Sequence, residues 1–216
     1  MPKTVFIERT LYSFDELSEK AKERARSDYR EGFEPHYGFI YDDAKTVGAL
    51  MGIEIRDRTY TTMGGGTGRE PCIYWSGFSC QGDGACFEGR YGFNGCALEQ
   101  VKTHVGEDAE IFRIAAELDR LQAICGGKLS AVVKQSGHYM HSRCTDIEVD
   151  VDGEDFDHDA FRDVEKDLKE ALRDFMDWIY KQLEAEYEYQ TSDEAIDEYL
   201  KEMTFSEAGR ELADHD

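Results

Sequence analysis

Two histidines and one cysteine recur at three-residue intervals in a short stretch of the chain, at His138, His141 and Cys144. Neutral imidazole and thiolate groups are ligands that zinc prefers, so these residues could hold the ion if Cys80 or Cys86 supplied a fourth ligand. The six cysteines form no C-x-x-C pair, which would be the stronger sign of a zinc ribbon or a redox site. Surface or packing roles explain the same residues, so we predict no bound metal and no cofactor.

Asp83 lies in the turn sequence Gln81-Gly82-Asp83-Gly84, where the glycines would let a ligand approach closely. With a nearby histidine it could form an acid–base pair, although turn chemistry explains Asp and Gly at these positions equally well. The glycine-rich run from Gly64 to Gly68 lacks the Lys-Ser/Thr that completes a phosphate-binding loop. We find no Ser/His/Asp arrangement and no dinucleotide fingerprint, and we therefore predict that the protein is not an enzyme.

The most informative pattern is a strand in which acids alternate with Ile147, Val149 and Val151. Side chains two residues apart on a strand share a face and lie roughly 6.6 Å apart, at about 3.3 Å per residue. This spacing is comparable to that of successive phosphates on a nucleic-acid strand. The acids of this strand are Asp146, Glu148, Asp150 and Asp152.

Further acids follow the strand, so that residues 146–159 hold eight acids and no Lys or Arg. Their spacing does not follow the calcium-loop pattern, which argues against a divalent-cation site. We expect them to bind a partner, together with two acids on the helix that follows. The added residues are Glu154, Asp155, Asp157, Asp159, Asp163 and Asp167.

Charge is distributed unevenly along the chain, whose formal net charge is −22. The segment Asp146–Asp216 has 26 acidic and seven basic residues, whereas the first 145 residues are nearly neutral. Phosphates would be repelled, so we expect no direct binding of nucleic acid. A basic partner would be attracted in a salt-dependent way, although a solvated surface that only keeps the protein soluble would have the same composition.

The periodicity of apolar residues predicts an α+β fold with a mostly antiparallel sheet of five or six strands and helices packed on one side. A capping box at Ser13 and Glu16 predicts a helix start, and Thr191 to Glu194 predicts another. The expected strands cover residues 4–10, 53–62, 72–78, 85–91, 129–135 and 145–151. The expected helices cover residues 13–31, 41–51, 108–125 and 159–187, with a last short helix around residues 196–203. Beyond Phe205 the tail is expected to fray.

These elements suggest a core domain over residues 1–152 and an acidic helical region over residues 153–216 that packs on the core or extends from it. No apolar run approaches the roughly 18 residues that a membrane span needs, and the first residues lack the apolar stretch of a signal peptide. We therefore expect the protein in the bacterial host cytoplasm, without membrane contact and with reduced cysteines. The oligomeric state is not predicted.

The motif Trp75-Ser76-Gly77-Phe78 followed by Gln81-Gly82-Asp83-Gly84-Ala85-Cys86-Phe87-Glu88-Gly89 resembles a family of small bacterial and phage proteins. Members are often labelled antitoxins of toxin–antitoxin systems. The resemblance covers Phe33 to Val151 and implies neutralisation of a protein partner, without implying any catalytic residue. The charge pattern also resembles that of anti-CRISPR proteins that mimic DNA.

Together these observations predict an acidic, phage-type inhibitor that binds a basic, nucleic-acid-binding surface of a bacterial defence complex. The partner would be a basic protein or a ribonucleoprotein. Two alternatives stay open: an antitoxin that neutralises a cognate toxin, and a metal-dependent enzyme or small-ligand binder that uses Asp83, His138, His141 and Cys144.

Overall fold

The computed structural model describes residues 9–106, 108–152 and 158–212, without the side chains of residues 158–160. The chain forms two compact units. The larger unit is Tyr37–Glu184, and the smaller unit combines Met1–His36 with Ala185–Asp216. This division differs from the predicted division at residue 152, because the last strand of the sheet and most of the long helix after it contribute to one apolar core.

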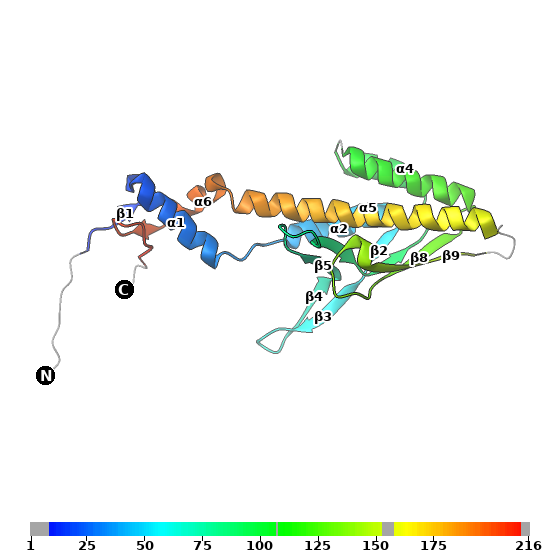
Figure 1. The fold of residues 1–216 in the computed structure, drawn as a ribbon, viewed down its shortest axis with the longest axis horizontal. Coiled ribbons are helices and arrows are strands. Elements are labelled where there is room, and N and C mark those ends of the chain that lie inside the picture. Colours follow the sequence, from blue (N-terminus) through cyan, green and yellow to red (C-terminus); the bar gives the residue numbers. More distant parts are fainter. Residues whose placement is uncertain (1–8, 107, 153–157, 213–216) are drawn as a thin grey trace. The chain divides into compact units, whose positions relative to one another are not determined.

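Most elements of the chain belong to the larger unit, as Figure 1 shows. Its helices are α2 (Gly38–Leu50), α3 (Ala97–His104), α4 (Ala109–Ile124) and most of α5 (His158–Gln190), with a short 3₁₀ helix, η2 (Ser142–Cys144). Its strands are β2 (Ile53–Ile55), β3 (Asp57–Thr61), β4 (Thr67–Pro71), β5 (Ile73–Ser76), β6 (Gly84–Phe87), β7 (Gly89–Tyr91), β8 (Leu129–Gln135) and β9 (Thr145–Val151).

All of the described strand pairs are antiparallel, which confirms the predicted α+β class. The strands are distributed over a four-stranded sheet in the order β2-β7-β8-β9 and three two-stranded sheets. The hairpin of residues 129–135 and 145–151 was predicted with the bounds that the structure shows. The predicted strand over residues 53–62 is divided into β2 and β3, which pair with different partners.

The division occurs at a three-way junction of backbone segments. Arg56 donates its N–H to the carbonyl oxygen of Glu88 at 2.8 Å, Cys72 donates to Arg56 at 2.7 Å, and Glu88 donates to Cys72 at 2.9 Å. These three bonds form a closed cycle in which each residue both donates and accepts. At each of the three residues a strand leaves one neighbour and begins to pair with another. The segment from β2 to β7 is thus divided into three antiparallel pairs, β2–β7, β3–β4 and β5–β6, the first of which belongs to the four-stranded sheet.

Helices cover one face of the four-stranded sheet with a shared apolar core. The α5 side chains at helical spacing, including Leu168, Leu172 and Phe175, are fully buried with Ile111 and Leu118 of α4. Such a stripe is the expected core-facing side of an amphipathic helix, and both helices were predicted. Of the described helices, none is long and apolar enough to cross a membrane.

The helix α3 was not predicted, because its start has no capping residue of its own. Asp119 of α4 supplies the cap: its two carboxylate oxygens accept the N–H groups of Ala97 at 2.8 Å and Leu98 at 3.0 Å. A carboxylate at this place accepts hydrogen bonds from amides that have no partner within the helix, and its negative charge is attracted by the positive end of the helix dipole. The start of α3 is therefore determined by a tertiary contact, which a local sequence pattern cannot show.

The smaller unit contains β1 (Tyr12–Ser13), a 3₁₀ helix η1 (Phe14–Glu16), α1 (Glu19–Gly32), α6 (Asp193–Leu200) and β10 (Thr204–Phe205). The capping box of Ser13 and Glu16 forms as predicted, but it begins η1, and Ser18 caps α1 instead. Residues 4–8 of the predicted first strand, which covers residues 4–10, lie outside the described residues. The strand β1 begins later, at Tyr12. The tail expected to fray turns back after β10, where Leu212 donates its N–H to Thr204 at 2.9 Å.

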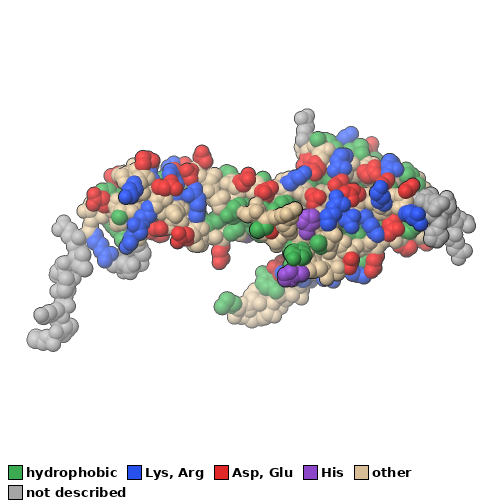
Figure 2. All heavy atoms as spheres, in the orientation of Figure 1, with side chains coloured by type: hydrophobic (Ala, Val, Ile, Leu, Met, Phe, Trp, Pro, Cys, Tyr) green, Lys and Arg blue, Asp and Glu red, His purple; other side chains and the backbone are tan. Residues whose placement is uncertain are grey.

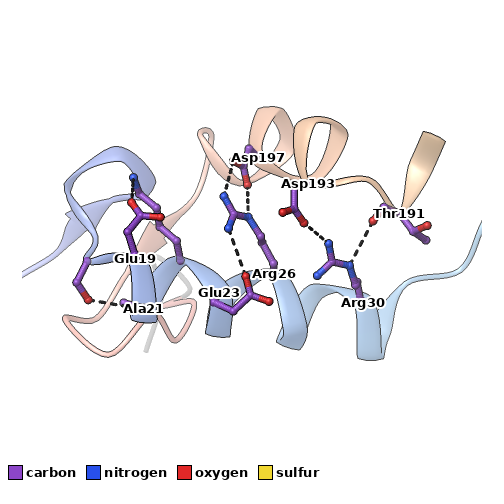
Figure 3. A network of polar contacts seen from close by, with 10 residues as sticks. Glu19, Ala21, Glu23, Arg26, Arg30, Thr191, Asp193 and Asp197 are labelled. Carbon is purple, nitrogen blue, oxygen red and sulfur yellow. Dashed lines mark hydrogen bonds and ion pairs between the residues drawn. The ribbon is translucent and has the colours of Figure 1, made fainter. Parts of the chain in front are cut away.

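Ion pairs join α1 to α6 within the smaller unit, as Figure 3 shows. Arg26 donates from two nitrogens to the two carboxylate oxygens of Asp197, both at 2.7 Å. Arg30 pairs with Asp193 and also donates to the carbonyl oxygen of Thr191. The hydrogen bonds from Arg26 lower the pKa of Asp197 below its ordinary value. A bidentate pair of this kind adds geometric specificity to the packing of the two helices.

We expect the Arg26→Met variant to weaken the attachment of α1 by about 1 kcal/mol at pH 7, since both hydrogen bonds to Asp197 are lost. Because the folded pKa of Asp197 is lowered, this contribution is present above its unfolded pKa of about 3.9. It is lost as pH falls through the folded pKa. Hydrogen exchange of the α1 amides should therefore be faster in the variant at pH 7, with a difference that shrinks in acid. Arg24→Met is the control, because Arg24 approaches Asp28 only at 3.7 Å on the exposed side of α1.

Candidate protein-interaction surface

The hairpin of β8 and β9 presents carboxylates on the sheet face that the helices do not cover. Thr145 and Ile147 are buried, whereas Asp146, Glu148 and Asp150 are exposed. This alternation follows from the period of two in a strand, because one set of side chains joins the core and the other faces water. Asp152, directly after the strand, is exposed as well.

Bases on the neighbouring strands share this face, which we call the open sheet face. The register places Lys134 opposite Asp146, and Lys134 pairs with Glu148 at 3.1 Å. Arg90 of β7 lies between Glu54 of β2 and Val132 of β8. Both partners of the Lys134 pair are exposed, so the pair neutralises charge while adding little stability.

A shallow groove of about 410 Å³ crosses the same face over β2, β7 and β8. Its lining mixes both signs of charge, with Glu54, Arg56, Glu88, Arg90 and Lys134 around Val132. The open sheet face is therefore acidic along β9 and mixed toward β2. The basic residues were missed from the sequence because their positions depend on strand register, although Lys134 could have been placed from the predicted hairpin.

The strand β9 forms one edge of the four-stranded sheet. Within the described part of the chain, no strand pairs with its outer side. Charged side chains on an edge strand discourage pairing with other proteins, which is a second physical reason for acids at this place. The carboxylates of Asp146, Glu148 and Asp150 thus follow the outermost strand of the sheet.

The two helical acids of the predicted binding set lie elsewhere. Asp163 is exposed on α5, and Asp167 pairs with Arg120 of α4 at 2.6 Å. Because α5 covers the inner face of the sheet, these acids do not extend the open sheet face. Glu154, Asp155 and Asp157 lie outside the described residues, as does the side chain of Asp159.

Many acids of α5 are already paired within the protein. Arg143 holds both carboxylate oxygens of Glu170 at 2.8 and 2.6 Å, which lowers the pKa of Glu170. Arg113 pairs with Asp174 at 2.9 Å. On the face that Figure 2 shows, blue and red side chains accordingly lie interspersed over the part of α5 in the larger unit.

The candidate metal ligands have local roles. The Nδ1 atom of His141 accepts the N–H of Arg143 at 3.0 Å, and the ring of His138 packs edge-on against Tyr139. Among the described residues, no group of three metal-ligating side chains is close enough to hold an ion. Burial raises the pKa of the Cys86 thiol to about 11, which keeps it protonated at neutral pH.

Asp83 closes its turn. One of its carboxylate oxygens accepts the N–H of Ser79 at 2.9 Å and that of Cys80 at 2.7 Å. These bonds, with the one from Cys80 foremost, lower the pKa of Asp83. An ionised carboxylate that is occupied by its own backbone fits the turn explanation better than an acid–base role.

A family model described as a domain of unknown function, DUF8835, matches residues 36–193. The chain belongs to the DUF8835 family. The comparison with curated proteins and the comparison with solved structures returned no match. The DUF8835 match begins where the larger unit begins and runs through α5, whereas the resemblance seen in the sequence ended at Val151. The long helix is therefore part of the DUF8835 domain and not an added tail.

The distinctive motif of this DUF8835 member forms an aromatic cluster on the β5–β6 hairpin. Trp75 stacks on Phe78 with ring centroids 5.0 Å apart and donates its indole N–H to Tyr41 at 2.9 Å. Tyr180 of α5 packs against Phe78 and donates its hydroxyl to the carbonyl oxygen of Gly77 at 2.9 Å. The motif thus ties the hairpin to α2 and α5, which is a structural role.

Proposed function

We propose that this protein is a non-enzymatic inhibitor that binds a basic partner through the acidic strand β9. The partner class is a protein or ribonucleoprotein of a bacterial defence complex that normally holds nucleic acid. The observation that supports the proposal is the row of exposed carboxylates at Asp146, Glu148 and Asp150 of β9, continued by Asp152 directly after it. Their spacing of roughly 6.6 Å matches a basic surface built to contact successive phosphates.

The extent of the acidic row indicates which residues contact the partner. Arg90 and Lys134 on the adjacent strands restrict the anionic strip to the outer strand. On α5, Asp167, Glu170 and Asp174 are paired with arginines of the same unit. We therefore assign recognition to β9 alone, and not to the helical acids Asp163 and Asp167. Long-range attraction from the net charge of −22 would speed the encounter, while the strip would determine where the partner docks.

Replacing the four acids of the strip by their amides should abolish salt-sensitive capture of the partner. We expect pull-down from host lysate by the wild-type chain to be strong at low salt and weak at high salt, because exposed charges are screened within about 10 Å at 0.1 M. The variant Asp146→Asn, Glu148→Gln, Asp150→Asn, Asp152→Asn should capture at least tenfold less partner protein at low salt than the wild-type chain does. Mass spectrometry quantifies the captured protein.

A matched control removes the same four charges from the smaller unit. Glu31, Glu34, Glu194 and Glu202 are exposed there, and their replacement by Gln gives the same net charge. If capture depends on total charge, both variants lose it equally, and assignment to β9 is wrong. A captured small toxin encoded beside the gene would instead favour the antitoxin alternative.

A further inference from the structure

The ribbon of β3 and β4 extends away from the rest of the larger unit, as Figure 1 shows. All five residues of β3 are exposed, and Met63 at the connecting turn is fully exposed. An isolated two-stranded hairpin is only marginally stable in water and usually needs a third strand or a covering layer. Tyr60, which packs over Gly68, supplies part of that cover from within the ribbon.

Hydrogen bonds at the two ends of the ribbon show which backbone groups face outward. Thr62 donates its N–H to Gly66 at 2.8 Å, and Cys72 donates to Arg56 at 2.7 Å. Bonded and non-bonded positions alternate along an antiparallel ladder, so the even-numbered residues of β3 bond to β4. Thr59 and Thr61 therefore direct their N–H and C=O groups to the free edge, which no strand of the described residues occupies.

The two edges of the ribbon differ in protection. The strand β4 carries Gly68, Arg69, Glu70 and Pro71, and glycine, charge and proline all discourage pairing at an edge. The strand β3 has its charges, Asp57 and Arg58, at the end next to the three-way junction. From Thr59 to Thr62 its edge is uncharged and consists of β-branched and aromatic residues, which favour strands. The β3 edge is thus the unprotected one.

We infer that β3 pairs antiparallel with β3 of a second copy of this chain, which extends the two ribbons into one four-stranded sheet. The sequence is self-complementary in this arrangement. Pairing centred on Tyr60 places the two tyrosines opposite each other and Thr59 opposite Thr61. Pairing centred on Thr59 places Arg58 opposite Tyr60. Neither register places like charges opposite one another, which would be destabilising.

Electrostatic repulsion between two copies of the chain is weaker at this ribbon than at the acidic parts of the surface. The ribbon contains two acids and two bases, Asp57, Glu70, Arg58 and Arg69, so it is neutral in a chain of net charge −22. A neutral ribbon that extends from the body lets two copies meet with less repulsion than any acidic face would. This self-association goes beyond the proposed inhibitor function and does not depend on it.

The mass of the full chain in solution tests the inference. Light scattering and sedimentation should show a concentration-dependent species of twice the 24.7 kDa of one chain, favoured by salt because screening weakens the repulsion. Thr61→Pro should reduce association at least tenfold, since it removes an outward N–H. Thr67→Pro is the matched control: Thr67 lies opposite Thr61 in the ladder, so the same change affects only the β4 edge.

Cross-linking provides a measurement that does not depend on proline. The exposed cysteines Cys80, Cys96 and Cys144 are first replaced by serine. Tyr60→Cys should then give a disulfide-linked dimer if pairing is centred on Tyr60, and Thr59→Cys should give one if it is centred on Thr59. Met63→Cys, at the exposed turn, should cross-link less. A wild-type chain that stays monomeric at several hundred micromolar in high salt, or equal effects of the two proline variants, would overturn the inference.

Discussion

Replacing Phe175 by alanine is expected to lower the free energy of unfolding of the larger unit by about 3–5 kcal/mol. The ring is fully buried, stacks on Trp178 with centroids 5.7 Å apart, and meets Phe87 edge-on at 5.9 Å. Truncation removes contacts with β6, α2 and α5 together, and leaves a cavity that the backbone closes only in part.

Urea unfolding followed by tryptophan fluorescence measures this loss, because Trp75 and Trp178 both belong to the larger unit. The control is Phe39→Ala, which removes the same ring from an exposed position of α2. We expect a change below about 0.5 kcal/mol for the control. Similar urea midpoints for the two variants would show that the buried ring of Phe175 contributes no more to stability than an exposed ring does.

Gly89→Ala is expected to destabilise the same unit by about 3 kcal/mol. A Cβ atom at Gly89 would lie 2.1 Å from the carbonyl oxygen of Glu54, so β2 and β7 would have to separate. The clash is with backbone and not with a flexible side chain, and it falls beside the three-way junction. Because β2, β7 and β8 pair side by side, the strain should spread across the sheet.

Gly92→Ala is the matched control in the same region, since a Cβ atom there would meet nothing within 4 Å. Its effect on the urea midpoint should be small or slightly stabilising, because alanine restricts the unfolded chain more than glycine does. If both alanines cost the same, glycine is needed at Gly89 for some reason other than the close approach of β2.

Local patterns predicted the elements whose signals lie within themselves. The apolar stripes of α4 and α5 and the strict alternation in β9 specify helix and strand by period, so these elements and the exposed face of Asp146, Glu148 and Asp150 could be predicted. The box of Ser13 and Glu16 was also correct as a cap, but it could not reveal that a 3₁₀ turn precedes α1.

Features that depend on contacts between distant segments were not predictable in this way. The three-way junction at Arg56, Cys72 and Glu88 decides where strands change partners, and Asp119 decides where α3 begins. Strand register brings Lys134 and Arg90 to the acidic face, and arginines partly neutralise Asp167, Glu170 and Asp174 of α5.

By itself the sequence determined the α+β class, the amphipathic helices, the net charge and the outward row of acids on β9. These properties follow from periodicity and composition, which are local. Only the tertiary structure decided that α5 packs into the core of the larger unit, that the acidic row is one strand wide, and that no strand of the described residues pairs with the outer edge of β3. The reason is that register and partner choice depend on packing between residues far apart in the chain, for which a single sequence carries no local signal.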